Sequence, residues 1–436
     1  MTLKSLSPIV DARVTPIAFR DPPLLNVAGV HEPWALRSII EVHTADGRVG
    51  LGESYGDLQT LANLNRIAPR LKGLSPFDLN ALTRVVYAEV AHPSESEPAP
   101  DPGADYPAAG DKARASAVAA FEVAFLDLQG QVLGLPLHQL LGGAVRPAVP
   151  YSAYLFYKFA KHKNIDTDFD AYPADDWGEA VTPAQVVAQA QRMVAQYGFG
   201  SLKLKGGVFA PEVEIEALLA LRRAFPDMPL RIDPNGGWSV ATTRRVMPLL
   251  AANGLLEYLE DPVPTLQEMG EVAKFASMPL ATNMCVTTME EFRRNADTHA
   301  VSILLSDHHY WGGLRATASL ARMCSVFGLG MSMHSNSHLG ISLAAMTHVG
   351  VTIPNLRYAC DTHYPWQVDE VITGGKLKIE GGQLAPPPGA GLGVTLDHAA
   401  LAQLHSNYVE CGIRVRDDAN EMRKHQPDFD DRRPRF

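Results

Sequence analysis

SLKLKGG (residues 201–207) opens a pattern that recurs six more times along the chain. In each repeat a short apolar run ends in a polar side chain of a catalytic type, and a helical stretch follows. The later runs are LRIDPNG (230–236), LEYLED (256–261), PLATNM (279–284), SILLSD (302–307), GLGMSMHSNS (328–337) and LRYACDTH (356–363). From Lys205 to Asp361 the polar residues follow one another at steps of 28, 27, 23, 24, 27 and 27 residues.

Each step has the length of one strand, one helix and two connecting loops. Sustained strand–helix alternation predicts parallel βα units. A (β/α)8 barrel gathers its catalytic side chains at the C-terminal ends of its strands. We therefore expect a barrel whose mouth holds the polar residues that end these runs: Lys203, Lys205, Asp233, Glu260, Asn283, Asp307, His334, Asp361 and His363.

The whole-chain composition limits the class of protein. The 436 residues are 46% hydrophobic and carry a formal net charge of -10 at pH 7. Nucleic-acid binding calls for a basic face, so we expect no nucleic-acid partner. The four cysteines form no CxxC pair, which indicates ordinary thiols in a reducing compartment. MTLKSLSPIV lacks the apolar core of a secretory signal, and no run of about 18 apolar residues suggests a membrane span. We expect a cytoplasmic protein.

The segments on either side of the repeats indicate a second module. Residues 8–20 and 35–53 alternate as half-buried strands do, with a hairpin at Asp46-Gly47. Helical patterns follow at 57–72, 76–90 and 113–133, and the Pro-rich acidic segment 92–112 reads as a surface loop. Residues 149–157 are expected as the first barrel strand, and Thr182 as the cap of the helix after it. The tail, with a helix at 397–411, is expected to return to the N-terminal module.

Asp233, Glu260 and Asn283 supply two carboxylates and an amide oxygen on adjacent strands. Hard oxygen ligands suit Mg²⁺, which keeps water or substrate oxygens at its other positions. Each residue also has a plain structural reading, because Asp-Pro-Asn-Gly is a turn sequence and Glu260 could simply end a strand. Their recurrence at one point of the repeat favours the metal site.

Lys203 and Lys205 lie two apart in a strand and therefore on one face. Such pairs often face solvent, but the apolar and small flanks predict a buried strand that points both lysines into the barrel mouth. Two ammonium groups side by side, near a metal, are expected to depress each other's pKa and make one a usable base.

His334 follows an apolar strand, and Asp307 ends the strand before it. Asp307 could orient the imidazole and raise its basicity, although a single histidine is often structural. His363 and Asp361 could form a similar pair or an inert strand cap. A divalent metal flanked by a Lys base and a His–Asp base indicates removal of the proton α to a carboxylate, with an enediolate stabilised by the metal.

These motifs resemble the enolase superfamily and, within it, the D-glucarate dehydratase branch. The resemblance runs from LLNVAGVHEP to RDDA and rests most on FGSLKLKGGV, IDPNGGWS, EDP, ATNM, FGLGMSMHSNSHLGISLA and CDTHYPWQ. It implies a (β/α)7β TIM-like barrel with an α+β capping domain built from both termini. The expected boundaries are residues 1–140 for the cap, 141–395 for the barrel and 396–436 for a returning segment.

The resemblance also implies a role for each site residue. Lys205 would take the proton from one epimer while Lys203 assists at the carboxylate. His334, paired with Asp307, would serve the other epimer and return a proton to the departing hydroxyl. Asn235 and Asn336 would hold the reacting end, with Mg²⁺ on Asp233, Glu260 and Asn283. The remaining substrate contacts would be Asn26, His31, Tyr154, Phe156, Ser335, His363 and Arg416.

The expected activity is Mg²⁺-dependent dehydration of an acid sugar, D-glucarate first and L-idarate second, to 5-dehydro-4-deoxy-D-glucarate. The expected partner is this small molecule, and we expect a homo-oligomer. Three alternatives remain. One is a dehydratase or epimerase for a different aldarate or aldonate, and another is a weakly catalytic relative that binds aldarates. The third is an unrelated metal-dependent barrel such as an aldolase, which would lack a cap assembled from both chain ends.

Overall fold

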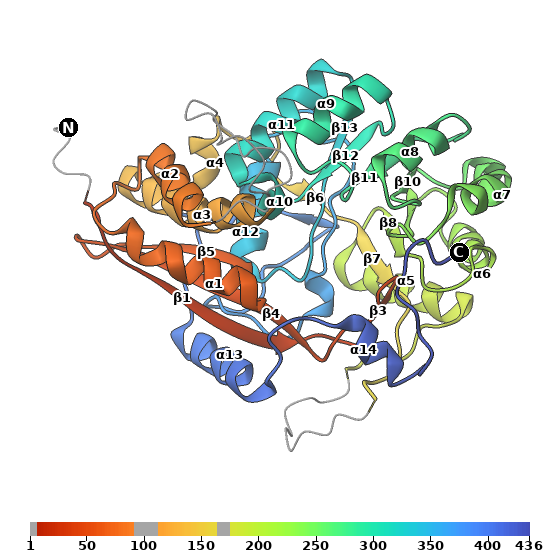
Figure 1. Cartoon of the computed structure of the whole chain (residues 1–436), viewed down its shortest axis with the longest axis horizontal. Coiled ribbons are helices and arrows are strands. Elements are labelled where there is room, and N and C mark those ends of the chain that lie inside the picture. The colour runs from red at the N-terminus through yellow and green to blue at the C-terminus, as the bar shows by residue number, and fades with distance from the viewer. Residues whose placement is uncertain (1–6, 91–111, 164–174) are drawn as a thin grey trace.

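The computed structural model describes residues 7–90, 112–163 and 175–436, and it places an α+β domain against a parallel barrel (Figure 1). The surface loop expected at 92–112 lies outside the described residues, apart from Lys112. In Figure 1 the N-terminal strands and helices form one side of the molecule, and the barrel strands with their outer helices form the other.

The N-terminal sheet has the antiparallel order β1-β4-β5, formed by Ile9–Arg20, Trp34–Thr44 and Val49–Tyr55. Gly47, at φ 87°, allows the tight turn of the predicted hairpin between β4 and β5. Between β1 and β4 the chain forms the short pair β2 (Leu25–Asn26) and β3 (Gly29–Val30). The helices of this domain are α1 (Leu58–Ile67), the 3₁₀ turn Ala68–Leu71, α2 (Leu79–Glu89) and α3 (Lys112–Leu133).

Helix α3 is the centre of this domain. Two glycines of β5 let it approach the sheet: a Cβ on Gly50 or Gly52 would lie 2.1 or 2.3 Å from the carbonyl oxygen of Ala124 or Ala120. Among the described helices, α3 is long and apolar enough by length and composition to cross a membrane, but 83% of that window is buried inside the protein. Its apolar surface is therefore explained by packing on all sides.

The barrel sheet has the order β13-β12-β11-β10-β9-β8-β7, and its neighbouring strands run parallel. Its strands are Ala153–Phe156 (β7), Leu202–Lys205 (β8), Leu230–Asp233 (β9), Tyr258–Glu260 (β10), Leu280–Thr282 (β11), Ile303–Ser306 (β12) and Gly330–Met333 (β13). The helices between and after them are Pro183–Tyr197 (α5), Pro211–Ala224 (α6), Val240–Ala251 (α7), Leu266–Ala273 (α8), Met289–Thr298 (α9), His308–Trp311 (α10), Leu314–Val326 (α11) and Gly340–Gly350 (α12).

The eighth strand position is filled by residues 356–361. Parallel bridges join Leu356 to Met331 and Cys360 to Tyr151, so this segment closes the barrel between β13 and the chain before β7. Backbone hydrogen bonds from Asp361 to Met333 (2.9 Å) and from Ser152 to Cys360 (2.8 Å) support the closure. The (β/α)7β barrel and its capping domain are thus confirmed.

The predicted first barrel strand proves to be two elements. β6 (Val149–Pro150) pairs with β14 (Gln383–Leu384) outside the barrel sheet, and only β7 enters it. Three further short elements lie at separate places in the chain: α4 (Leu137–Leu140), a 3₁₀ turn at Ala252–Gly254 and another at Tyr364–Trp366. Thr182 caps α5 as expected, in a capping box with Gln185 and with Pro183 at the first helical position.

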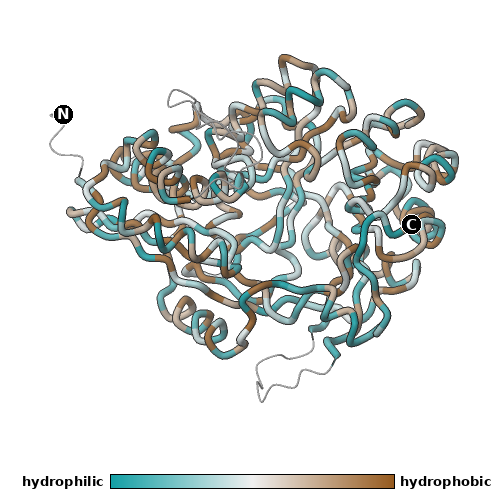
Figure 2. The backbone as a smooth tube through the Cα atoms, in the orientation of Figure 1, coloured by the Kyte–Doolittle hydropathy of each residue, from teal (hydrophilic) through white to brown (hydrophobic). Residues whose placement is uncertain are grey.

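The C-terminal tail returns to both domains. Helix α13 (His398–Cys411) packs on β1 and α14 (Asp418–Arg423) packs beside β3, as the sequence predicts. The last residues instead reach the barrel, where the backbone nitrogens of Arg435 and Phe436 bond to the carbonyl of Gly237. Figure 2 shows this charged tail as a largely hydrophilic path. The three domain boundaries stay a prediction.

Candidate active site

The strand ends meet at the barrel mouth, as parallel pairing requires. In the β8–β9 ladder Lys205 stands opposite Asp233, and in the β7–β8 ladder Tyr154 and Phe156 stand opposite Lys203 and Lys205. Glu260 ends β10, while Asn283, Asp307 and His334 directly follow β11, β12 and β13. The structure therefore brings the predicted residues of six successive strands to one edge of the sheet.

The two lysines lie among carboxylates. Lys205 Nζ is 2.6 Å from Asp233 Oδ2, and Lys203 Nζ is 2.6 Å from Glu260 Oε2 and 2.7 Å from Asp361 Oδ2. Burial lowers the pKa of Lys203, but Asp361 and Glu260 outweigh it and raise that pKa well above its usual value. The expected mutual depression of the lysine pKa values is therefore not seen at Lys203, which is held as an ammonium group.

A divalent cation fits the charges and free oxygens of this floor. The carboxylates of Asp233, Glu260, Asp261 and Asp361 face two ammonium groups, which leaves two negative charges over. Burial and the neighbouring Asp233 and Asp361 raise the pKa of Glu260 well above normal, although Lys203 opposes them. Among the described residues, the buried oxygens Glu260 Oε1 and Asn283 Oδ1 have no hydrogen-bond partner. Such groups are suited to bind a cation.

Asp261 supports the site from behind. Carboxylate oxygens of Asp233, Glu260 and Asp261 all lie within 4.8 Å of one another. However, Asp261 accepts hydrogen bonds from the Thr282 hydroxyl and from the Asn283 backbone nitrogen, so it orients Asn283. Burial and Asp233 raise its pKa to about 6. Asp261 and Asn235 have left-handed backbones, at φ 35° and 57°, which is a costly conformation that often marks functional loops.

On the other side of the mouth, His334 and Asp307 form the predicted pair. His334 Nδ1 is 3.1 Å from Asp307 Oδ2. A carboxylate only accepts, so His334 donates from Nδ1, and in the neutral imidazole Nε2 is then the nitrogen that carries the lone pair. Burial raises the pKa of Asp307, but His309 and His334 lower it more, to well below its usual value. The predicted alternative pair of His363 with Asp361 does not form, because Asp361 binds Lys203 instead.

These groups surround a cavity of about 480 Å³, a volume typical of small-molecule sites. Both Lys205 and His334 line it. The other predicted residues in its wall are Asn26, His31, Tyr154, Phe156, Asn235, Asn283, Asn336, His363 and Arg416. Six predicted residues are buried outside this lining: Lys203, Asp233, Glu260, Asp307, Ser335 and Asp361. The Ser335 hydroxyl donates to the carbonyl of Asn336.

One wall of the cavity connects the carboxylate floor to the capping domain. Tyr154 donates from its hydroxyl to Asp233 Oδ2 (3.3 Å), and its ring lies 4.6 Å from that of Phe156. Phe156 in turn meets the ring of His31 edge-on at 5.8 Å, and His363 packs against both aromatic residues. This aromatic wall therefore runs from the carboxylate floor at Asp233 to His31 of the capping domain.

The far end is polar and comes from the cap and the tail. Arg416 donates to both oxygens of Asp418 (2.7 and 2.8 Å), and Asn26 Nδ2 donates to Asp418 Oδ2 (2.8 Å). Burial raises the pKa of Asp418, but Arg416 and His31 bring it down to about 2. His31 Nδ1 binds Asp21 Oδ2 at 3.0 Å. The Arg416 guanidinium thus stands at this end of the cavity paired with the Asp418 carboxylate.

Comparison with known proteins identifies the family. The description "Mandelate racemase / muconate lactonizing enzyme, N-terminal domain" matches residues 11–142, and "Enolase C-terminal domain-like" matches residues 185–400. A protein of Streptomyces coelicolor named "Probable glucarate dehydratase" is 51% identical over 97% of each chain. The chain belongs to the enolase superfamily.

Two solved structures of the enolase superfamily are similar over nearly the whole chain. An enolase from Pseudomonas fluorescens Pf0-1, crystallised with magnesium, potassium and tartrate, has a TM-score of 0.91 and 54% identity, covering 98% of this chain and 99% of that one. An enolase from Mycobacterium smegmatis, complexed with tartrate, has a TM-score of 0.90 and 49% identity, covering 98% of each. This chain is therefore similar to superfamily enzymes in sequence and in fold.

Several residues that line the cavity were not predicted from the sequence. Arg37, Tyr55 and Tyr310 line the cavity, together with Asp418 and Lys112. The amide of Asn336 donates to the hydroxyls of both tyrosines at 3.2 Å. Burial raises the pKa of Tyr310 to about 12 and that of Tyr55 well above normal, so both stay protonated. In the sequence, the only signal for the two tyrosines was their position shortly after a predicted strand.

Proposed function

We propose that this enzyme is a magnesium-dependent dehydratase that removes water from a six-carbon sugar diacid, with D-glucarate as the first substrate. The observation that carries the proposal is the position of Lys205 and His334 on one cavity, beside a set of oxygen ligands that carries excess negative charge. A Lys or His base with bound Mg²⁺ is the enolase-superfamily solution for deprotonation next to a carboxylate.

Asp233, Glu260 and Asn283 would hold the ion. When bound, Mg²⁺ supplies Lewis-acid stabilisation of the negative charge that develops on the substrate carboxylate. Lys203 stays an ammonium group between Glu260 and Asp361, and it adds positive charge beneath the same carboxylate. Asn235 and Asn336 would hold the reacting end by their amides.

His334 acts first on D-glucarate. Its unprotonated Nε2 takes the proton from the carbon next to the carboxylate, and the other proton stays on Nδ1, hydrogen-bonded to Asp307. The same imidazolium then gives this proton to the hydroxyl on the neighbouring carbon. The carbon–oxygen bond breaks, water leaves, and the enol product rearranges to the 5-dehydro-4-deoxy acid. Lys205 serves the opposite configuration and makes L-idarate the second substrate.

The polar far end supports a diacid. Arg416, His31 and Asn26 lie across the aromatic wall from the reacting end, where a second carboxylate would be held. Ser335 and His363 are further proposed contacts. The relative named "Probable glucarate dehydratase" and the tartrate in two similar structures support this class, because tartrate is also a hydroxylated dicarboxylate.

The test is a substrate panel with Mg²⁺ and purified enzyme, read as 2-oxo acid by semicarbazone absorbance. D-Glucarate and L-idarate should turn over, while galactarate and the monoacid D-gluconate should be at least tenfold slower. His334→Asn and a chelator-treated sample are the controls. Preference for a monoacid would contradict the diacid assignment. Epimer interconversion without 2-oxo acid would contradict dehydration.

A further inference from the structure

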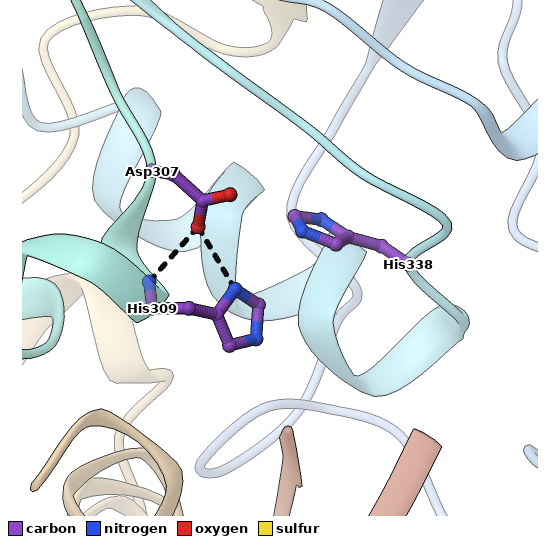
Figure 3. A group of neighbouring side chains, drawn as sticks. All are labelled: Asp307, His309 and His338. Atoms are coloured by element: carbon purple, nitrogen blue, oxygen red, sulfur yellow. Dashed lines mark hydrogen bonds and ion pairs between the residues drawn. The ribbon is translucent and has the colours of Figure 1, made fainter. Parts of the chain in front are cut away.

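Asp307, the partner of His334, also belongs to a cluster of three buried side chains. Asp307, His309 and His338 bring their ligand atoms within 4.8 Å of one another, and Figure 3 shows them facing each other. His309 is fully buried and is not part of the cavity lining. The member of the cluster that touches the His334 base is Asp307.

The two oxygens of Asp307 serve different partners. Oδ1 accepts from the backbone nitrogen and from Nδ1 of His309, both at 2.9 Å, as the dashed lines in Figure 3 mark. Oδ2 faces His334 Nδ1 at 3.1 Å and the Tyr55 hydroxyl at 3.4 Å. Because a carboxylate accepts only, His309 must carry a proton on Nδ1. These bonds fix the plane of the carboxylate and aim Oδ2 at His334.

The opposite side of His309 contacts the capping domain. Its Nε2 lies 3.2 Å from Arg37 Nη2, 3.1 Å from the Ser342 hydroxyl and 3.3 Å from the Glu53 carbonyl. A guanidinium only donates, so Nε2 is the acceptor in the contact with Arg37. Arg37 is itself held by Glu53, with Nε 2.9 Å from Oε1.

The same facts argue against a metal ion in this cluster. A cation held by His309 would stand beside the Arg37 guanidinium. Asp307 already serves both imidazoles. In the described part of the chain neither ring nitrogen of His338 has a hydrogen-bond partner, so His338 belongs to the packing of the cluster.

We propose that His309 is a positioning residue for the His334 base: anchored by Arg37 of the cap, it locks the Asp307 carboxylate and thereby the tautomer and orientation of His334. This inference rests on the proposed two-base function. It makes the barrel base depend on a capping-domain arginine that lies 272 residues away from His309 in sequence. Burial raises the pKa of the Asp307 carboxyl. Among its neighbours, His309 lowers that pKa most strongly, which agrees with this role.

The first test uses the two half-reactions of one active site. The magnesium-loaded enzyme is incubated in D₂O with D-glucarate, whose exchange depends on His334, or with L-idarate, whose exchange depends on Lys205. His309→Phe should slow D-glucarate exchange about tenfold or more and leave L-idarate exchange within about twofold. His309→Asn keeps an N–H near the Nδ1 position and should recover most of the loss. His338→Phe is the matched control for packing and should match the unaltered enzyme.

Equal loss in both half-reactions, or no loss, would overturn the inference. Loss in His338→Phe as large as in His309→Phe would also overturn it and would favour a metal cluster. If the unaltered enzyme exchanges neither diacid, the proposed function fails, and ¹⁵N NMR of the histidine rings still tests the positioning. His334 should be the Nδ1–H tautomer in the unaltered protein and a mixture in His309→Phe. An unchanged tautomer would overturn the inference.

Discussion

Lys205 Nζ lies 2.6 Å from Oδ2 of Asp233, its partner across the β8–β9 ladder. The proposed base for one epimer is therefore bonded to a proposed metal ligand. His334 and Asp307 form a separate pair, directly after β13 and β12. The two bases consequently have separate partners, and a substitution at one should not disable the other.

Lys205→Met should stop proton exchange on L-idarate and spare the exchange on D-glucarate. The loss should be at least about 100-fold, as expected when a general base is removed, and proton NMR in D₂O measures it. Lys203→Met is the comparison, because it frees Glu260 and Asp361 and should slow both diacids. Equal loss on both diacids in Lys205→Met would refute the two-base scheme.

Glu260→Gln should weaken Mg²⁺ binding about tenfold or more, because a buried carboxylate with a free oxygen is replaced by a neutral amide. Isothermal calorimetry measures the affinity directly, and the rise of Tm on adding Mg²⁺ should shrink as well. The matched control is Glu257→Gln, three residues earlier, where the carboxylate binds Arg231 at 2.6 Å. Unchanged affinity in Glu260→Gln would contradict the ligand assignment.

Glu122 should make stability depend on pH. Its carboxylate accepts from the Leu314 nitrogen at 2.6 Å, and burial raises its pKa from 4.5 to about 7. A raised acid pKa stabilises the folded state fully below the unfolded pKa, and this stability is lost as pH rises through the folded pKa. Between pH 4.5 and 7, Glu122→Gln should therefore gain about 3 kcal/mol on the unaltered protein. Urea unfolding at several pH values measures it, and a constant difference would contradict this account.

Removal of residues 433–436 should impair the site more than the fold. The Phe436 carbonyl accepts from the Ser239 nitrogen, and Arg433 Nη1 donates to the Asn235 carbonyl (3.4 Å), so this segment braces the loop that carries Asn235. KM for D-glucarate should rise several-fold while Tm changes by a few degrees. Arg432→Ala, which removes an exposed pair with Asp430, is the control. An unchanged KM would show that the loop holds itself.

The barrel and its mouth could be predicted because both follow from local pattern. Apolar runs of strand length end at Asp233, Glu260 and His334, and parallel pairing brings the ends of successive strands to one edge. No knowledge of long-range contacts is needed for that step. The cap was predictable for the same reason, from alternation and the Asp46-Gly47 turn.

The remaining features depend on contacts between distant segments. Arg37 and Tyr55 reach the cavity because the cap sheet docks on the barrel, which no local spacing encodes. The choice of Asp361 for Lys203 rather than His363 depends on barrel closure. Likewise, the tail was expected to return to the N-terminal module, yet its last residues form backbone bonds to the barrel loop at Gly237.

The central claim is that two bases on one cavity act on opposite configurations of a diacid. Proton NMR of D-glucarate with enzyme and Mg²⁺ in D₂O tests it most directly. The account predicts deuterium at the carbon next to the carboxylate, signals of the 5-dehydro-4-deoxy acid, and the same product from L-idarate. If either diacid shows neither exchange nor product, with Mg²⁺ shown to be bound, the claim is contradicted.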